Sequence, residues 1–125
     1  MPSKEIAGRA FQFAVRVVAL YERLVDVSGA SRALAPQLLR AATSIGANLE
    51  EASAAQTKPD FIAKVSISRK EARETAYWLR LILATSTAQK SEIEWQLQEV
   101  VELIAILGAI VYRARLSPRR GDGPS

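Results

Sequence analysis

Residues 4–27 of the chain, KEIAGRAFQFAVRVVALYERLVDV, carry an apolar side chain at every third or fourth position. The series consists of Ile6, Ala10, Phe13, Val17, Leu20, Leu24 and Val27. A spacing that alternates between four and three places all of these side chains on one face of an α-helix, and no strand pattern competes with it. The stretch therefore predicts a long amphipathic helix that ends at Ser28-Gly29, because glycine accepts the left-handed backbone of a helix end.

The same periodicity returns in the next two stretches. A second helix is predicted from near Arg32 or Pro36 to about Ala55, since proline fits best in a first helical turn. Thr57 is expected to cap a third helix that runs to about Thr85. The series on the expected inner face are Leu34, Leu38, Ala41, Ile45, Asn48 and Ala52 in the second helix, and Phe61, Val65, Ser68, Ala72, Thr75, Leu79 and Ile82 in the third. All are apolar except Asn48, Ser68 and Thr75.

A fourth helix is predicted to begin at a capping box. Ser91 and Glu94 have the Ser-x-x-Glu spacing in which each side chain bonds a backbone N–H at the start of a helix. The helix is expected to run to about Leu116, where Ser117-Pro118 stops it. Four helices with short connections favour an all-α fold, an antiparallel up-down-up-down four-helix bundle.

Length and composition agree with one helical domain. Hydrophobic residues make up 49% of the 125 residues but aromatic residues only 6%, so Ala, Leu, Ile and Val must fill the core. These small and aliphatic side chains suit close helix packing better than a sheet. We expect a bundle domain over residues 1–118 and a disordered tail over residues 119–125.

The residue types that the chain lacks argue against catalysis. It has no histidine and no cysteine, which removes the commonest general base, the commonest metal ligand and every thiol nucleophile. Two-metal carboxylate sites in helical bundles also use Glu-x-x-His pairs. We therefore expect no catalytic residues, no metal site and no cofactor.

No segment of the sequence resembles a membrane or export signal. No apolar run follows a positive region at the amino terminus, as a secretory signal requires. The longest apolar stretch, residues 100–112, is interrupted by Glu102 and is shorter than the roughly 18 residues of a membrane span. We expect a cytoplasmic protein without a membrane partner.

Apolar side chains cover almost the whole circumference of the fourth helix. A helix that is apolar all round is buried all round, and a lone bundle leaves each helix an outer face. Self-association is therefore predicted. The interface residues expected are Tyr77, Trp78 and Leu81 of the third helix, and Val101, Ile106 and Ile110 of the fourth. The alternative is a wide, alanine-rich core that shelters these side chains within one chain.

Basic side chains form two stripes along predicted helices. The first stripe has a spacing of seven, and the second, which includes Tyr77, has spacings of four, four and three. Residues 58–86 hold six basic and three acidic residues, a net of +3, in a chain of net charge +4. The candidate nucleic-acid contacts are Arg9, Arg16 and Arg23, and Lys64, Arg69, Lys70, Arg73 and Arg80. Such stripes suit phosphate contacts, and the alternative is a solvated face with local ion pairs.

Two motifs resemble a known bacterial family. They are Arg-x-x-x-Ser-Ile-x-x-Asn, with its members at Arg40, Ser44, Ile45 and Asn48, and Glu-Ala-Arg-Glu-Thr-x-Tyr-Trp-Leu over residues 71–79. The chain is similar over residues 6 to about 115 to the four-helix proteins encoded in intervening sequences of 23S ribosomal RNA genes. That family also includes the accessory variability proteins of diversity-generating retroelements.

The resemblance implies a bundle that assembles into a ring, typically a homopentamer, without enzymatic activity. It implies a structural role for the first motif, in which Asn48 is read as a buried polar group. Retroelement members bind nucleic acid and a reverse transcriptase, which makes both of them candidate partners. The function predicted is a non-enzymatic oligomeric accessory protein that binds RNA or DNA through basic helix faces. An oligomeric protein-binding scaffold without nucleic-acid binding is the alternative.

Overall fold

Four helices account for nearly all of the chain in the computed structural model, which describes residues 2–27 and 29–118. They are α1 (Pro2–Leu24), α2 (Ala30–Ser53), α3 (Lys58–Thr85) and α4 (Lys90–Leu116). The described residues contain no strand, so the predicted all-α class is confirmed. The disordered tail predicted over residues 119–125 lies outside the described residues.

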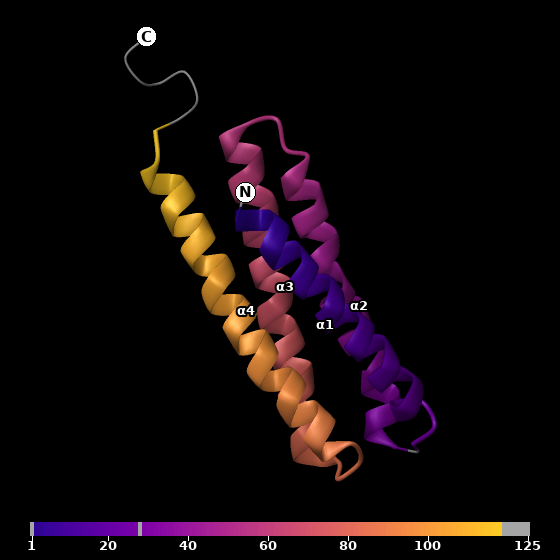
Figure 1. Ribbon diagram of the computed structural model, residues 1–125. Coiled ribbons are helices and arrows are strands. Elements are labelled where there is room, and N and C mark those ends of the chain that lie inside the picture. Colours follow the sequence, from indigo (N-terminus) through magenta and orange to yellow (C-terminus); the bar gives the residue numbers. More distant parts are fainter. Residues whose placement is uncertain (1, 28, 119–125) are drawn as a thin grey trace.

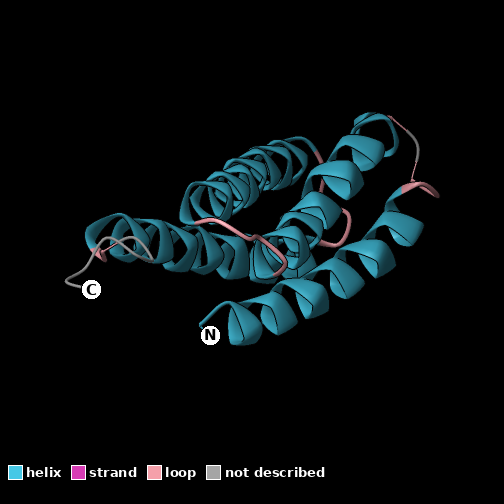
Figure 2. Ribbon diagram, turned by 90° about the horizontal axis from the view of Figure 1, so that it is seen from above, coloured by secondary structure: helices cyan, strands magenta, loops and turns pink. Residues whose placement is uncertain are grey.

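The helices form an antiparallel bundle in which each one packs against two neighbours. The pairs in contact are α1 with α2, α2 with α3, α3 with α4, and α4 with α1, and the last pair packs least extensively. Successive helices run in opposite directions, so α1 begins and α4 ends at the same end of the bundle (Figure 1). Seen from above, short loops join the helices only at their ends (Figure 2).

The predicted apolar faces of α1 and α3 lie in the core, to which all four helices contribute. In α1, Ile6 through Leu24 of the series are buried, and only Val27, beyond the helix, is half-buried. In α3, every member of the series except the half-buried Phe61 is buried. The small side chains in the middle of α3 let α2 approach closely: the buried Ser68 hydroxyl donates a hydrogen bond of 2.8 Å to the carbonyl oxygen of Ile45.

The buried face of α2 differs from the prediction. Leu34 and Asn48 are only half-buried, whereas Ala35 and Leu49 are fully buried. The other four members, Leu38, Ala41, Ile45 and Ala52, are buried as predicted, and the buried sector is wider than one series because α2 packs against both α1 and α3. Asn48 is therefore not a buried polar group: its amide nitrogen donates to the carbonyl oxygen of Ser44 in the same helix, at 2.8 Å.

The helix starts were predicted with mixed success. The Thr57 cap is confirmed, since its hydroxyl accepts a hydrogen bond of 3.2 Å from the backbone N–H of Asp60. The Ser91 capping box is wrong: α4 is capped by Gln89, whose φ of 57° is left-handed, without a side-chain hydrogen bond. Pro36 lies inside α2 rather than in its first turn, on the exposed side where water can reach the backbone.

Candidate nucleic-acid interface

Arginines of the α1 stripe are hydrogen-bonded to glutamate side chains of α4. Nε and Nη2 of Arg9 donate to the two carboxylate oxygens of Glu99 at 2.7 and 2.8 Å. Nη2 also reaches Glu102 at 2.6 Å. A bidentate guanidinium–carboxylate pair is among the strongest side-chain hydrogen bonds. Arg9 is therefore neutralised within the chain.

The next two members of the stripe are also hydrogen-bonded, Arg16 to α4 and Arg23 to the residue before that helix. Arg16 donates to both carboxylate oxygens of Glu92, at 3.0 and 2.7 Å, and its guanidinium carbon lies 3.5 Å from the ring centroid of Trp95. Arg23 donates to the side-chain oxygen of Gln89 at 3.0 Å. Phosphate contacts by this stripe stay a prediction: in the structure its side chains bond toward α4, which with α1 forms the pair of helices that pack least extensively.

These contacts change the acidity of the groups that make them. The hydrogen bond from Arg9 lowers the pKa of Glu99, and the hydrogen bond from Arg16 lowers the pKa of Glu92. The same hydrogen bonds raise the pKa of both arginines. Both carboxylates are thus stabilised in the charged form, as expected for a carboxylate beside a cation.

The Arg40 motif joins α2 to α3. The guanidinium of Arg40 forms an ion pair with Glu74 and lies 3.4 Å from Glu71. Glu74 also accepts a hydrogen bond of 3.0 Å from the indole nitrogen of Trp78, whose ring packs edge-on against Tyr77. Ser44 donates to the carbonyl oxygen of Arg40, and Ile45 is buried in the core. The motif residues thus make contacts within the chain, and its ion pairs come from Arg40, whereas Asn48 is half-buried.

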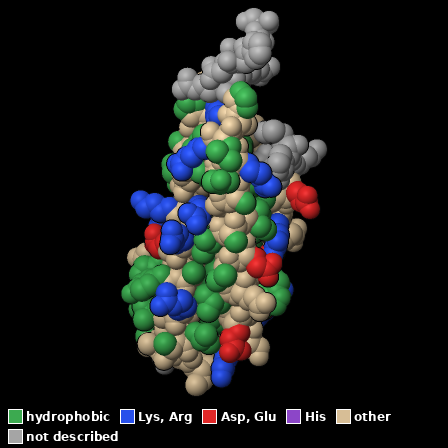
Figure 3. All heavy atoms as spheres, turned by 90° about the vertical axis from the view of Figure 1, so that its left-hand side faces the viewer, with side chains coloured by type: hydrophobic (Ala, Val, Ile, Leu, Met, Phe, Trp, Pro, Cys, Tyr) green, Lys and Arg blue, Asp and Glu red, His purple; other side chains and the backbone are tan. Residues whose placement is uncertain are grey.

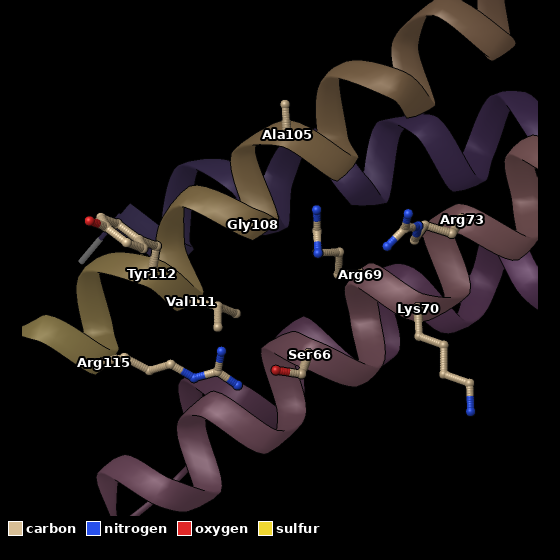
Figure 4. Close-up of a pocket in the computed structure, with 9 residues that line it drawn as sticks. All are labelled: Ser66, Arg69, Lys70, Arg73, Ala105, Gly108, Val111, Tyr112 and Arg115. Carbon is tan, nitrogen blue, oxygen red and sulfur yellow. The ribbon is translucent and has the colours of Figure 1, made fainter.

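The basic stripe of α3 has a different environment. Arg69, Lys70 and Arg73 line a recess of about 550 Å³ between α3 and α4, and Arg115 lines it from the α4 side. The remaining lining residues are Ser66, Ala105, Gly108, Val111 and Tyr112. Arg69, Arg73 and Arg115 extend into the space between the two helices, whereas Lys70 points away from α4 (Figure 4). We call this recess the cationic groove.

Arg69 forms the floor of the cationic groove. Its Nε donates to the carbonyl oxygen of Ile104 at 3.3 Å. The guanidinium lies against the backbone of α4 at Gly108, where a Cβ atom would be 3.0 Å from Nε. The glycine therefore makes room for the arginine, as glycine does where a close approach to backbone is needed.

The charged side chains that line the cationic groove are all positive. Among the described residues, four cationic side chains line it and no acidic side chain does. On the face of the molecule that α4 crosses, Lys and Arg side chains flank a band of hydrophobic ones, and few acidic side chains lie among them (Figure 3). Lys64 and Arg80, the other predicted contacts on α3, do not line the groove.

Sequence reasoning missed the α4 wall of the groove. Gly108, Tyr112 and Arg115 are spaced by four and three, which places them on one face of α4. That spacing was the available signal. The apolar residues around these three positions had led instead to the prediction of self-association.

The predicted interface residues fall into three groups. Tyr77 and Val101 are exposed, at 50% and 54%. Trp78, Leu81 and Ile106 are half-buried. Ile110 is only 6% exposed and belongs to the core of its own chain, so its assignment to an interface is corrected. The reason is that α4 turns this residue toward the other helices of the bundle.

The described part of the chain offers no group of three or more metal-binding side chains. Across residues 2–27 and 29–118, no helix combines the length and the apolar character needed to cross a membrane.

Comparisons with known proteins agree with this architecture. Residues 3–109 match the family described as 23S rRNA-intervening sequence protein. A similar solved structure is that of a protein of unknown function from the S23 ribosomal protein family of Bacteroides thetaiotaomicron. It is 36% identical, with a TM-score of 0.80, and the match covers 90% of this chain and 99% of that one. No protein with a curated description matches the chain. The chain therefore belongs to the family of 23S rRNA-intervening sequence proteins.

Proposed function

We propose that the chain is a non-enzymatic accessory protein that binds nucleic acid through the cationic groove and acts as an assembly of several copies. The observation that carries the proposal is the charge of the groove, where Arg69, Arg73 and Arg115 extend into one recess. Cationic side chains that no carboxylate neutralises gain affinity for phosphates by releasing the counterions of the nucleic acid.

The residues proposed to contact phosphates are fewer than those predicted from the sequence. The arginines of α1 are bonded to α4, so a phosphate would have to displace a carboxylate to reach Arg9 or Arg16. Replacing one anion by another gives little net gain in affinity. A phosphate that binds the groove side of α3 need not displace a carboxylate, because the cations there face an open recess.

Assembly is the second part of the proposal. Exposed apolar side chains on α1 and α4 support it, since contiguous apolar patches on soluble proteins mark interaction sites. They are Phe11, Val15 and Val18 on α1, and Trp95, Val101 and Leu116 on α4. The reverse transcriptase suggested by the family resemblance belongs to the same proposal. Co-purification of this chain with a reverse transcriptase encoded beside it tests that partnership.

The groove is tested by measuring the salt dependence of binding to labelled RNA and DNA. We expect binding at low salt that weakens steeply as salt rises. Arg73→Ala and Arg115→Ala should each weaken binding and reduce the slope of log affinity against log salt by about 0.7 to 0.9, the change expected for one lost phosphate contact.

The matched control is Arg32→Ala, which removes an exposed arginine of α2 that lies outside the groove and forms no ion pair among the described residues. This variant should bind as the wild type does. The proposal is wrong if no complex forms at low salt, or if the groove variants and the control bind equally well. A protein partner that survives nuclease treatment, without such a complex, would favour the scaffold alternative.

A further inference from the structure

Tyr112 is the one aromatic side chain that lines the cationic groove, among the residues that the structure describes. It is 65% exposed and lies at the edge of the recess, three residues before Arg115 in α4, with its ring directed outward, away from α3 (Figure 4). A large aromatic ring in water beside a cluster of guanidinium groups has no packing role in the core of this chain. Its place calls for a ligand that has both a flat apolar surface and a negative charge.

The form of the recess limits what that ligand can be. A volume of about 550 Å³ falls in the range of pockets that hold small molecules, roughly 300–1,000 Å³. The two helices form its walls, Arg69 forms its floor, and Val111 adds an apolar surface. A nucleotide with its base turned outward fits such a space. A duplex can offer its phosphates to the rim, but its bases are paired and stacked inside.

Nucleic-acid binding proteins combine cations with aromatic rings when they recognise single strands. The cations follow the backbone, and unpaired bases stack on the rings without sequence preference. An isolated phosphate would explain the guanidinium groups but not Tyr112. A purely apolar ligand would explain Tyr112 and Val111 but not the guanidinium groups.

We propose that the cationic groove selects single-stranded over duplex nucleic acid, with an unpaired base stacked on Tyr112 and its phosphates bound by Arg73 and Arg115. This inference rests on the proposed function and adds to it the class of nucleic acid that is bound. Stacking makes the preference independent of base sequence. The contribution of Tyr112 should also persist at salt concentrations that screen the arginines.

The test compares labelled oligouridylate with an RNA duplex of the same length by fluorescence anisotropy. The wild type should bind the single strand more tightly. Tyr112→Leu should weaken binding of the single strand by about fivefold or more, the loss expected for one stacked base. Its effect on the duplex should be small. Tyr112→Phe should keep the wild-type affinity, because the ring stacks without the hydroxyl.

Ile67→Ala is the control, since it removes a large apolar side chain of α3, 41% exposed, that lies outside the groove and outside the apolar surface proposed for assembly. It should leave both affinities unchanged. Equal affinity of the wild type for strand and duplex, with no effect of Tyr112→Leu, overturns this inference and leaves the proposed function standing. Failure to bind either RNA overturns both.

Two further measurements separate other occupants of the groove. Competition by an acidic peptide as effective as that of oligouridylate would make the groove a protein-binding site and overturn the inference. A lower mass of Tyr112→Leu in light scattering would place the ring between copies of the chain, with the same consequence. The stacked base is supported if Tyr112→Leu has the same mass as the wild type and the acidic peptide does not compete.

Discussion

Gly108 shapes the cationic groove through the side chain that it lacks. Glycine inside a helix costs about 1 kcal/mol relative to alanine. A Cβ atom at this position would lie 3.0 Å from Nε of Arg69 and 3.2 Å from its guanidinium carbon, closer than an ordinary contact. The unfavourable glycine is therefore offset by the position that it gives Arg69, whose Nε bonds to the carbonyl oxygen of Ile104.

Substitutions of Gly108 and Arg69 should therefore be coupled. Gly108→Ala should stabilise the Arg69→Ala protein by about 1 kcal/mol, because only the helix propensity then changes. In the wild-type background the gain should be smaller, since the new methyl group displaces the guanidinium. A double-mutant cycle measured by urea unfolding gives the coupling directly.

Gly8 provides the control for this cycle, because a Cβ atom there would meet no other atom within 4 Å. Gly8→Ala should stabilise both backgrounds equally, by about 1 kcal/mol. If Gly108→Ala also gives equal gains in both backgrounds, Arg69 does not depend on the glycine.

At the scale of the helices, charged side chains contribute to the contact between α1 and α4. They pack least extensively, and Arg9 and Arg16 bridge them. A glutamate whose pKa is lowered by folding adds stability above its ordinary pKa of 4.5, and this stability is lost as the pH falls through the lowered value. The raised pKa values of the arginines matter only in strongly alkaline solution.

Acid should therefore loosen the contact between α1 and α4. We expect Glu99→Gln to lower the stability at neutral pH by up to about 1 kcal/mol, a value kept small by the solvent around Arg9. Below pH 4.5 the melting temperature of the wild type should fall more steeply than that of Glu99→Gln. Thermal unfolding followed by circular dichroism across this pH range measures both effects.

Glu94→Gln serves as the reference, since Glu94 is an exposed residue of α4 without an ion pair among the described residues. Its melting curve should follow that of the wild type at every pH. Parallel curves for Glu99→Gln and the wild type would mean that the Arg9 contacts do not stabilise the fold.

The face that each helix buries was largely predicted from its own sequence, whereas contacts between two helices were not; the Ser91 capping box is a single-helix feature that was predicted wrongly. The apolar series of α1 and α3 is a property of each helix, and it was predicted almost completely. The hydrogen-bond partners of Arg9 and Arg16 are instead set by the facing helix, α4. Its partners Glu92 and Glu99 are also seven apart, on a helix predicted to lie antiparallel, and that match was the missed signal.

In the candidate site, too, the basic residues of α3 were predicted and the basic residue of α4 was not. Arg69, Lys70 and Arg73 were expected to bind nucleic acid from their spacing on α3, and they line the cationic groove. Arg115 became part of it through the packing of α3 against α4, which no single helix specifies. The depth of the groove depends on Gly108, whose importance is visible only when Arg69 lies beside it.

For the molecule as a whole, the exposed side of α4 remains the reason to expect assembly. Val101 is 54% exposed, although it lies among apolar residues on a helix whose opposite face is in the core. Leaving such a surface in water is unfavourable, at roughly 25 cal/mol for each Å² that another copy would cover. Light scattering should give a mass that is a multiple of the 13.7 kDa chain.

Two substitutions on the same helix separate assembly from folding. Val101→Glu should place an unpaired carboxylate between copies, which costs roughly 3 kcal/mol or more, or about a hundredfold in association. Its mass should fall to that of one chain while its helicity stays the same. Ile110→Glu should instead unfold the chain, because Ile110 is 6% exposed within the core. A wild-type mass of one chain at micromolar concentration, or an unchanged mass for Val101→Glu, would show that α4 does not join the copies.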